Sequence, residues 1–375
     1  MAQRWIPTVF TRGGTSKGLF FHGRDLPAAG PDRDAVFVSA MGSPDPYGRQ
    51  LNGMGGGQSS LSKVMIIEPS SREDAEVEYT FGQVDVKSAL VDYAANCGNL
   101  SSAVGPFAVD EGLCPREDGT TTVRIHNTNT GKLIHATFEV RDGVAETDGS
   151  MALPGVAGTG APVELEYFEP AGTRTGALLP TGLPAQDLTT PSGTFRVSMV
   201  DATNPMVFVR AADFGLDGTE SPDSIEARLD VMARLDCVRR AAATAMGMCD
   251  DPSRAPLGAP KIAVVAAPAP YTLLDGREVT AAEADIAIRV VSMGQLHRAL
   301  PGTAALCSAV AARVPGTLLH DIAPAGHGAP IHLASPSGVL TAGSKVEPVE
   351  GGGVHAVSAS LFRTARPLMK GFVAV

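Results

Sequence analysis

The sequence predicts an α+β protein made of two similar β-rich domains, each folded around one central helix. Glycine and proline are frequent, with 42 and 28 residues in a chain of 375, and short alternating or β-branched runs lie between them. Two helical segments are rich in alanine, serine and glycine, and their surroundings resemble each other. A stretch rich in proline, glycine and threonine, 179–193, lies near the middle of the chain and is the expected linker.

Strands are expected where residues alternate with period two or are β-branched. The expected strands are 76–86, 121–125, 133–140, 195–200, 206–209, 261–266 and 285–291. The sequence Asn-Thr-Asn-Thr-Gly at 127–131 lies between two of these runs and predicts a hairpin turn.

Helical patterns are fewer. An amphipathic helix is expected from about Ser221 to Met248, because Ser-Pro-Asp at its start is a typical helix-opening signal. The two small-residue helices follow Cys97-Gly98-Asn99 and Pro301-Gly302-Thr303.

These two helices indicate a duplication. Superposing the segment at Cys97 on the segment at Pro301 also pairs Gly112 with Gly316, and Gly18-Leu19-Phe20-Phe21 echoes Met206-Val207-Phe208-Val209. We therefore expect one domain over 1–185 and a second over 186–359. We expect these helices to start at Gly98 and Gly302 and to face a shared cleft. Their free N–H groups and helix dipoles would then attract carboxylates.

Composition limits the partners. The net charge is −10 and the pI about 5.3, with no basic stripe, so nucleic acid is not expected to bind. An anionic substrate then needs a local cationic pocket. The start of the chain lacks the features of a signal peptide, and no apolar run is long enough to span a membrane. Five dispersed cysteines favour reduced thiols and a cytoplasmic location.

The first candidate motif is Arg-Gly-Gly-Thr-Ser-Lys-Gly at 12–18. Its glycines allow backbone to approach a ligand, and Arg12, Thr15, Ser16 and Lys17 can donate to an anion. It is not a Walker A loop, because the second glycine does not precede the lysine. A plain turn with a solvated lysine is the alternative.

A second glycine-rich stretch, 53–57, precedes Ser60 and Lys63. The two residues match the S-x-x-K spacing of serine acylhydrolases, which needs a helix, whereas Val-Met-Ile-Ile at 64–67 predicts a strand. A lysine that enters a strand behind a glycine loop can point into a cleft, where burial makes it usable as a base.

Cys97 is the third candidate. A cysteine at the start of a helix has its thiolate stabilised and can exchange a proton near neutral pH. The alternative is a small buried side chain. The chain has no C-x-x-C, H-E-x-x-H or G-x-S-x-G motif, which favours proton transfer over metal or redox chemistry, so no metal and no cofactor are expected.

Taken together, these motifs resemble the 2-methylaconitate cis–trans isomerase (PrpF) family, which also contains 4-oxalomesaconate tautomerases. The resemblance spans essentially the whole chain. It rests on 12–18, Met-Gly-Ser-Pro-Asp-Pro-Tyr-Gly at 41–48, Ser62-Lys63, Asn96-Cys97-Gly98-Asn99-Leu100, Ser292-Met293-Gly294, 301–305, Pro336-Ser337-Gly338 and Thr364-Ala365-Arg366.

The resemblance implies the diaminopimelate epimerase-like fold, with two pseudo-symmetric domains and the active site between them. It also implies that the C-terminal strand, within 360–375, returns to the first domain. The family's catalytic pair falls on Lys63 and Cys97. In the two-thiol racemases of this fold each helix start carries a cysteine, but Pro301 stands at the second start here, so proton exchange between two thiols is ruled out.

The expected function is a cofactor-independent isomerisation, by allylic proton transfer, of a small unsaturated polycarboxylate of the methylaconitate or aconitate type. A 4-oxalomesaconate tautomerase and a catalytically silent binding protein are the alternatives. A homodimer is the assembly considered. The expected substrate-binding residues are Arg12, Thr15, Ser16, Lys17, Ser60, Gly98, Asn99, Asn204, Gly302 and Thr303.

Overall fold

The computed structural model describes residues 3–93, 97–115, 117–323, 330–349 and 352–375. Contacts divide the chain into two compact units, Met1–Glu166 with Phe362–Val375 (the first unit) and Tyr167–Leu361 (the second unit). The sequence placed this boundary later, at 185. The segment before the expected linker is fixed to the second unit, because Asp201 accepts hydrogen bonds from Thr173 and Thr175.

The first unit contains β1 (Trp5–Gly13), β2 (Ser16–His22), β3 (Lys63–Pro69), β4 (Val77–Val84), β5 (Val91–Asp92), β6 (Gly119–Asn127), β7 (Lys132–Arg141), β8 (Val144–Ala145), β9 (Met151–Ala152), β10 (Thr159–Gly160) and β23 (Ala365–Ala374). β11 (Val163–Phe168) leads into the second unit. The helices are α1 (Pro31–Met41) and α2 (Val104–Asp110), with the 3-10 helices η1 (Gly23–Asp25), η2 (Ser59–Leu61) and η3 (Leu100–Ala103).

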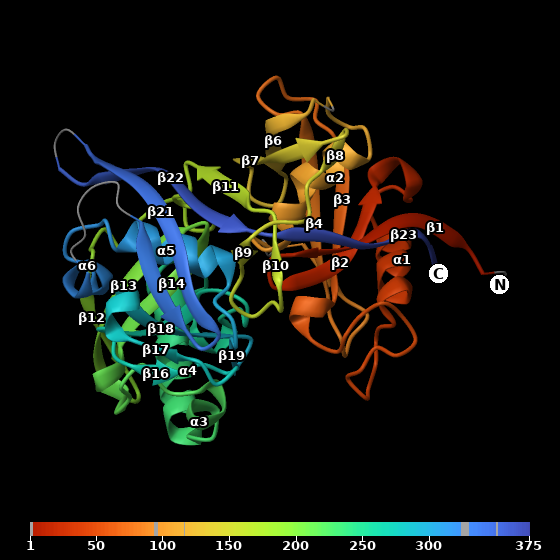
Figure 1. Cartoon of the computed structure of the whole chain (residues 1–375). Helices are drawn as coiled ribbons and strands as arrows, with labels where there is room; N and C mark the ends of the chain where they lie inside the picture. Colours follow the sequence, from red (N-terminus) through yellow and green to blue (C-terminus); the bar gives the residue numbers. More distant parts are fainter. Residues whose placement is uncertain (1–2, 94–96, 116, 324–329, 350–351) are drawn as a thin grey trace. The chain divides into compact units, whose positions relative to one another are not determined.

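The strands of the first unit wrap around one central helix (Figure 1). Every residue from Leu100 to Val109, in η3 and α2, is buried. Gly105 permits close contact with the sheet, because a Cβ there would lie 2.8 Å from the ring of Phe138 and 2.9 Å from Ala136 Cβ. The C-terminal strand β23 pairs with β1 in antiparallel orientation, as the resemblance implied.

The second unit contains β12 (Gln186–Thr190), β13 (Gly193–Ala202), β14 (Asn204–Arg210), β15 (Lys261–Ala266), β16 (Tyr271–Thr272), β17 (Glu278–Val279), β18 (Ile286–Ser292), β19 (Gln295–Leu296), β20 (Ile331–Ser335), β21 (Gly338–Pro348) and β22 (Val354–Arg363). Its helices are α3 (Pro222–Glu226), α4 (Leu229–Ala245), α5 (Gly302–Ala311) and α6 (Leu318–Ile322), with the 3-10 helices η4 (Ala211–Phe214), η5 (Pro252–Arg254) and η6 (Ala281–Glu283).

α5 is the central helix of the second unit and is buried along its whole length. It packs against β13, β14 and β21, as Figure 1 shows. α4 covers a different apolar cluster, which includes Val197, Val209 and Leu235.

The two units share one order of strand pairing. In the first, β1–β2 is antiparallel, β2–β3 parallel, β3–β4 antiparallel, β4–β6 parallel and β6–β7 antiparallel. In the second, β13–β14, β14–β15, β15–β18, β18–β20 and β20–β21 follow the same alternation. Each series contains one echoed segment, 18–21 in β2 and 206–209 in β14. The predicted α+β class with two pseudo-symmetric units is therefore confirmed.

Two helices differ from expectation. The helix expected from Ser221 to Met248 is broken into α3 and α4, because Arg228 leaves the helical conformation and its guanidinium donates to the carbonyls of Phe214 and Gly215. α1 was not predicted, although Pro31 at its start and Gly42 after its end, with φ of 73°, are ordinary helix boundary signals.

In the part of the chain that the structure describes, no helix is long and apolar enough to cross a membrane.

Candidate active site

The hairpin β1–β2 forms the first wall of the site. Arg12 pairs with Lys17 and Gly13 with Ser16, which leaves Gly14 and Thr15 as a tight two-residue turn. The turn lies against the residues before the central helix: a Cβ on Gly13 would be 2.7 Å from the carbonyl oxygen of Asn99. The glycines of the motif thus allow the turn to approach Asn99.

Asn99 organises the polar groups at this contact. Its Nδ2 donates to Thr15 Oγ1 at 2.9 Å and to Ser16 Oγ at 3.5 Å, and its Oδ1 accepts from Arg363 Nε at 3.3 Å. Because the guanidinium of Arg363 can only donate, the amide oxygen must face it, and this fixes the orientation of the Asn99 amide. Arg363 is only 1% exposed and was missed by the sequence prediction, since it lies 264 residues from Asn99.

Arg12 shapes the same turn. Its Nη1 donates to the carbonyl oxygens of Gly14 (3.1 Å) and Thr364 (2.8 Å) and to Thr364 Oγ1 (3.0 Å). Burial, with the nearby charge of Arg366 adding to it, lowers the pKa of Arg12. This guanidinium nitrogen therefore joins the hairpin to the segment before β23, and contact between Arg12 and a substrate stays a prediction.

Cys97 precedes the central helix of the first unit and is 6% exposed. Its Sγ accepts the N–H of Leu100 at 3.5 Å, and its carbonyl oxygen accepts from Ser101 N and Ser101 Oγ. The sulfur of Cys97 thus lies at the N-terminal end of the central helix. Gly98, next to it, is buried, whereas Asn96 lies outside the described residues.

The central helix begins with a 3-10 turn. It opens as the 3-10 helix η3 at Leu100, close to the predicted start at Gly98, and becomes α-helical at Val104. Pro106, the third residue of α2, has no N–H to donate to the carbonyl of Ser102, so this turn lacks one hydrogen bond of a regular α-helix.

Lys63 is the first residue of β3, as predicted for a lysine entering a strand behind a glycine loop. Its Nζ donates to Gln83 Oε1 at 2.9 Å and lies 4.8 Å from the centre of the Phe81 ring. Ser60 lies in η2, before the strand, so the S-x-x-K pair is not carried on an α-helix.

Gly18 links the two candidate catalytic residues through the fold. A Cβ at this position of β2 would lie 2.6 Å from the carbonyl oxygen of Lys63 and 3.0 Å from Leu100 Cδ1. Leu100 is the residue whose N–H contacts Cys97 Sγ. The Lys63 backbone and the Leu100 side chain thus both lie against this hairpin, whose turn is joined to Asn99 through Thr15 and Ser16.

Lys17 does not join this group. Successive side chains of a strand point to opposite faces, so Lys17 projects away from the face of Ser16. Its Nζ lies 5.5 Å from the centre of the Phe10 ring.

The second unit repeats the arrangement without a cysteine. Gly302 is the first residue of α5, as predicted, with Pro301 at the N-cap. The turn between β13 and β14 contacts this helix start, because Thr203 Oγ1, in a residue with φ of 60°, donates to the carbonyl oxygen of Thr303 at 3.0 Å. Asn204 is buried and its Nδ2 donates to the carbonyl oxygen of Pro205 at 3.2 Å. The sequence prediction missed Thr203.

The remaining buried thiols are poorly suited to proton transfer. Cys307 lies inside α5, fully buried, and burial raises its pKa. Burial, with a contribution from Glu76, raises the pKa of Cys114 to about 11. Among the described residues, no group of three or more His, Cys, Asp or Glu could hold a metal ion.

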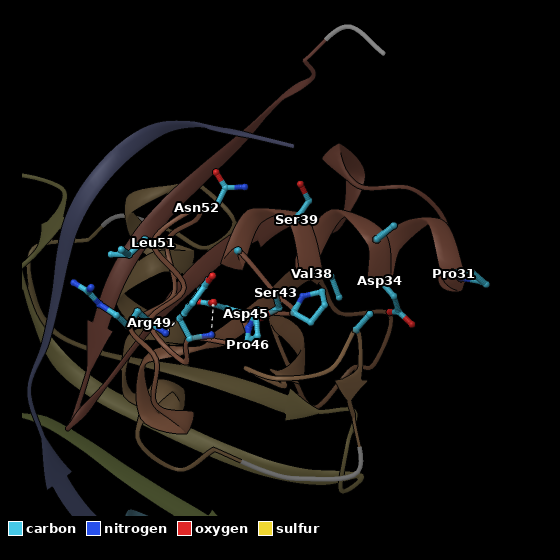
Figure 2. A pocket seen from close by; sticks show the side chains of 15 residues that line it. Pro31, Asp34, Val38, Ser39, Ser43, Asp45, Pro46, Arg49, Leu51 and Asn52 are labelled. Carbon is cyan, nitrogen blue, oxygen red and sulfur yellow. Dashed lines mark hydrogen bonds between the residues drawn. The ribbon is translucent and has the colours of Figure 1, made fainter.

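A surface cavity of about 1140 Å³ lies in the first unit beside α1 and the segment 42–52 (Figure 2). The residues that line it include Asp34, Asp45, Arg49 and Asn52 but none of those predicted for the site. The segment 41–48 therefore has one side on this cavity, and Figure 2 shows Asp45 turned back toward its own loop. There its carboxylate accepts the N–H groups of Tyr47 and Arg49.

Comparisons with known proteins agree over the whole chain. Residues 3–375 match the family described as PrpF protein. The chain is 41% identical to the 3-methylitaconate isomerase of Eubacterium barkeri over 378 residues, covering 100% of this chain and 98% of the relative. It is 40% identical to the 2-methyl-aconitate isomerase of Shewanella oneidensis over 385 residues, covering 99% and 96% of the two chains.

A solved structure of methylitaconate-delta-isomerase superposes with a TM-score of 0.85 at 40% identity, covering 100% of this chain and 96% of the other. A hydroxyproline epimerase from Agrobacterium vitis, at 14% identity and a TM-score of 0.56, shares the fold over 99% of this chain and 93% of its own. With a family match over nearly all of its length and full-length isomerase relatives, this chain belongs to the PrpF family.

Proposed function

We propose that this PrpF-family isomerase moves a proton along a small unsaturated di- or tricarboxylate of the 2-methylaconitate or aconitate type, with Lys63 and Cys97 as the acid–base pair. The observation that most supports the pair is Gly18, which lies against both the Lys63 carbonyl and the Leu100 side chain. Full-length relatives named 3-methylitaconate isomerase and 2-methyl-aconitate isomerase support the class of substrate.

The reaction starts at an allylic C–H next to a double bond conjugated with a carboxylate. Neutral Lys63 takes this proton, and the electron pair of the C–H bond delocalises into a dienolate. Cys97 gives its proton to the carbon that becomes saturated. This shifts the double bond, or returns it after rotation as the geometric isomer. The ammonium of Lys63 then reprotonates the Cys97 thiolate, and the protein regains its starting state without a cofactor.

Positioned proton transfer typically accelerates a reaction by about 10²–10⁴-fold, so the dienolate also needs stabilisation. Thr15 and Ser16 are suited to this task. Each hydroxyl oxygen accepts from Asn99 Nδ2, which leaves its own hydrogen to donate to a substrate carboxylate. Buried Arg363, in contact with Asn99 Oδ1, adds positive charge beside them. Gly302 and Thr303 stay predictions for the same role.

A tautomerase reaction is the second candidate. The chain is 36% identical to the 4-oxalomesaconate tautomerase of Pseudomonas putida, covering 100% of this chain. The same residues would move the proton, because this reaction is also an allylic transfer next to carboxylates. A cytoplasmic location and a homodimer also belong to the proposal.

A substrate screen in deuterated water tests the proposal. The protein is incubated separately with cis- and trans-aconitate, 2-methylaconitate, itaconates and 4-oxalomesaconate, while the vinylic and allylic proton signals are followed by NMR. We expect deuterium incorporation and a new isomer with at least one methylaconitate- or aconitate-type acid. Turnover of 4-oxalomesaconate alone would select the tautomerase, and neither exchange nor product with any acid would contradict an isomerase of this class.

A further inference from the structure

Gln83 lies directly opposite Lys63 in the sheet. The antiparallel register of β3 and β4 pairs these two residues, and such pairs place their side chains on one face, about 5 Å apart. Gln83 Oε1 accepts the hydrogen bond from Lys63 Nζ at 2.9 Å. The contact is thus produced by the register of two strands.

The amide of Gln83 has one orientation. Its Nε2 donates to the carbonyl oxygens of Ser59 at 3.0 Å and Ser62 at 2.8 Å. Carbonyl oxygens only accept, so they fix the NH₂ end of the amide. The oxygen end is left facing Lys63.

Ser62, whose carbonyl oxygen is one of the two that accept from Gln83, is contacted in turn by Gln50 through its hydroxyl. Ser62 Oγ accepts from Gln50 Nε2 at 2.7 Å and donates to the carbonyl oxygen of Val84 at 2.9 Å. Gln50 is fully buried, and its Oε1 accepts the N–H of Gly57 at 3.0 Å. Gln50 N also donates to Asp45 of the segment 41–48, so this motif supports Lys63 through a chain of hydrogen bonds.

Phe81 bounds Lys63 Nζ on another side. It lies two residues before Gln83 on β4 and therefore shares its face of the sheet. The centre of the Phe81 ring is 4.8 Å from Lys63 Nζ. The Phe81 N–H donates to Asn129 Oδ1, and the Phe81 carbonyl oxygen accepts from Asn129 Nδ2. A polar acceptor and an apolar ring thus restrict the directions in which the amine can point.

We propose that Gln83 is a positioning residue for Lys63: its Oε1 accepts one N–H of the neutral amine and so directs the nitrogen lone pair at the allylic carbon. The inference rests on the proposed role of Lys63 as the base. Gln83 has no part in bond making, so its loss should act on the rate of proton transfer and leave substrate binding nearly unchanged.

The first test removes the acceptor. Gln83→Met keeps the length of the side chain, and Gln186→Met, at a half-buried position on β12, is the matched control. We expect kcat to fall by about 10²-fold with KM within about twofold in Gln83→Met, since a misplacement of about 1 Å has that effect. The control should match wild type. A normal kcat in Gln83→Met would overturn the inference.

The second test separates positioning from a purely structural role. Gln83→Glu has the same shape and places a negative charge beside Lys63, which stabilises the ammonium over the neutral amine. The acidic limb of the pH profile of kcat/KM should therefore move to higher pH by about 1 unit or more. A slower enzyme with the wild-type profile would mean that Gln83 only supports the loop, which contradicts the inference.

Lys63→Met, assayed in parallel, separates a failure of the proposed catalytic pair from a failure of the inference about Gln83. An active Lys63→Met variant refutes the proposed catalytic pair, and the inference about Gln83 with it. An inactive Lys63→Met variant beside normal Gln83 variants refutes the inference alone.

Discussion

At the scale of single residues, the side-chain amide of Asn99 connects the polar groups of the candidate site. One amide joins the hairpin through Thr15 and Ser16 to the C-terminal segment through Arg363. The two hydroxyls keep their hydrogens for an anion because Asn99 supplies the donor between them. A change at this amide should therefore weaken substrate binding and also slow the reaction, because the same hydroxyls are proposed to stabilise the dienolate.

Asn99→Asp tests this role. The aspartate still accepts from Arg363 but cannot donate to Thr15, and its charge repels a carboxylate. We expect KM to rise at least about tenfold, because two like charges about 4 Å apart interact by about 1–4 kcal/mol. The matched control is Asn52→Asp, at an exposed position beside the surface cavity. Steady-state kinetics on the isomerised acid measure the effect, and equal KM values for the two variants would contradict it.

The site residues expected from the sequence, among them Thr15, Ser16, Lys63 and Cys97, stand in local motifs, and their roles stay predictions. The sequence could not predict Gln83, because only the register of β3 and β4 brings it opposite Lys63. Arg363 and Thr364 were missed for a similar reason: their partners Asn99 and Arg12 are 264 and 352 residues away. The sequence analysis used the neighbouring segment Thr364-Ala365-Arg366 only as a motif of the family resemblance.

At the scale of elements, β2 is the spacer between β3 and the start of the central helix. It pairs in parallel with β3, Leu19 opposite Val64, and Gly18 lies at the end of that contact. Any side chain there would press on the backbone of Lys63, so the glycine sets how closely the Lys63 backbone approaches the start of the central helix.

Gly18→Ala tests this spacing. The new Cβ would meet the carbonyl oxygen of Lys63 at 2.6 Å, a backbone atom that cannot turn away. We expect a loss of about 1–3 kcal/mol in the free energy of unfolding, as for other overpacked sites, together with a reduced kcat.

The control is Gly371→Ala in β23, where the nearest atom, Met369 Sδ, is at an ordinary 3.5 Å. Urea denaturation and kinetics of both variants check the prediction. If Gly18→Ala were as stable and as active as the control, the proposed spacing would be wrong.

Strands were predicted better than helix boundaries. The expected strands at 133–140 and 261–266 correspond to β7 and β15, because alternation and β-branching are local properties. The central helix opens close to the expected Gly98, but the 3-10 turn before its α-helical part was not predicted. The break at Arg228 depends on carbonyls of Phe214 and Gly215, which are remote in sequence.

At the scale of the whole molecule, two units of one topology carry different groups at corresponding positions. Cys97 precedes the central helix of the first unit and Pro301 precedes that of the second. The duplication was visible in the sequence from a few aligned residues. The return of the C-terminal strand to the first unit came from the family resemblance, because no local pattern shows which strand will pair with β1.

Glu111 ties that returning strand to the rest of the first unit. At the end of α2, it accepts from Lys370 of β23 at 2.7 Å and lies 3.4 Å from His22 of β2. Burial alone would raise the pKa of Glu111, but the hydrogen bonds from Lys370 and His22 outweigh burial and lower it. A lowered pKa means that Glu111 stabilises the fold above its ordinary value near 4.3, and that this stability is lost as pH falls through the folded-state pKa.

Glu111→Gln should therefore lower the free energy of unfolding by about 1 kcal/mol at neutral pH, and its difference from wild type should shrink below about pH 4. The control is Glu347→Gln, which removes an exposed ion pair with Lys345 and should change little. Urea midpoints at both pH values provide the measurement. Equal effects of the two substitutions at neutral pH would contradict the prediction.

Hydrogen exchange in Lys63→Met and Cys97→Ser tests the proposed acid–base pair most directly. With Lys63 as base and Cys97 as acid, Cys97→Ser should still exchange allylic protons with deuterated water while forming no isomer, whereas Lys63→Met should do neither. Each variant should lose at least about 10²-fold in kcat, and the double variant should be little worse than the worse single one. Near-normal turnover in either single variant would contradict the account.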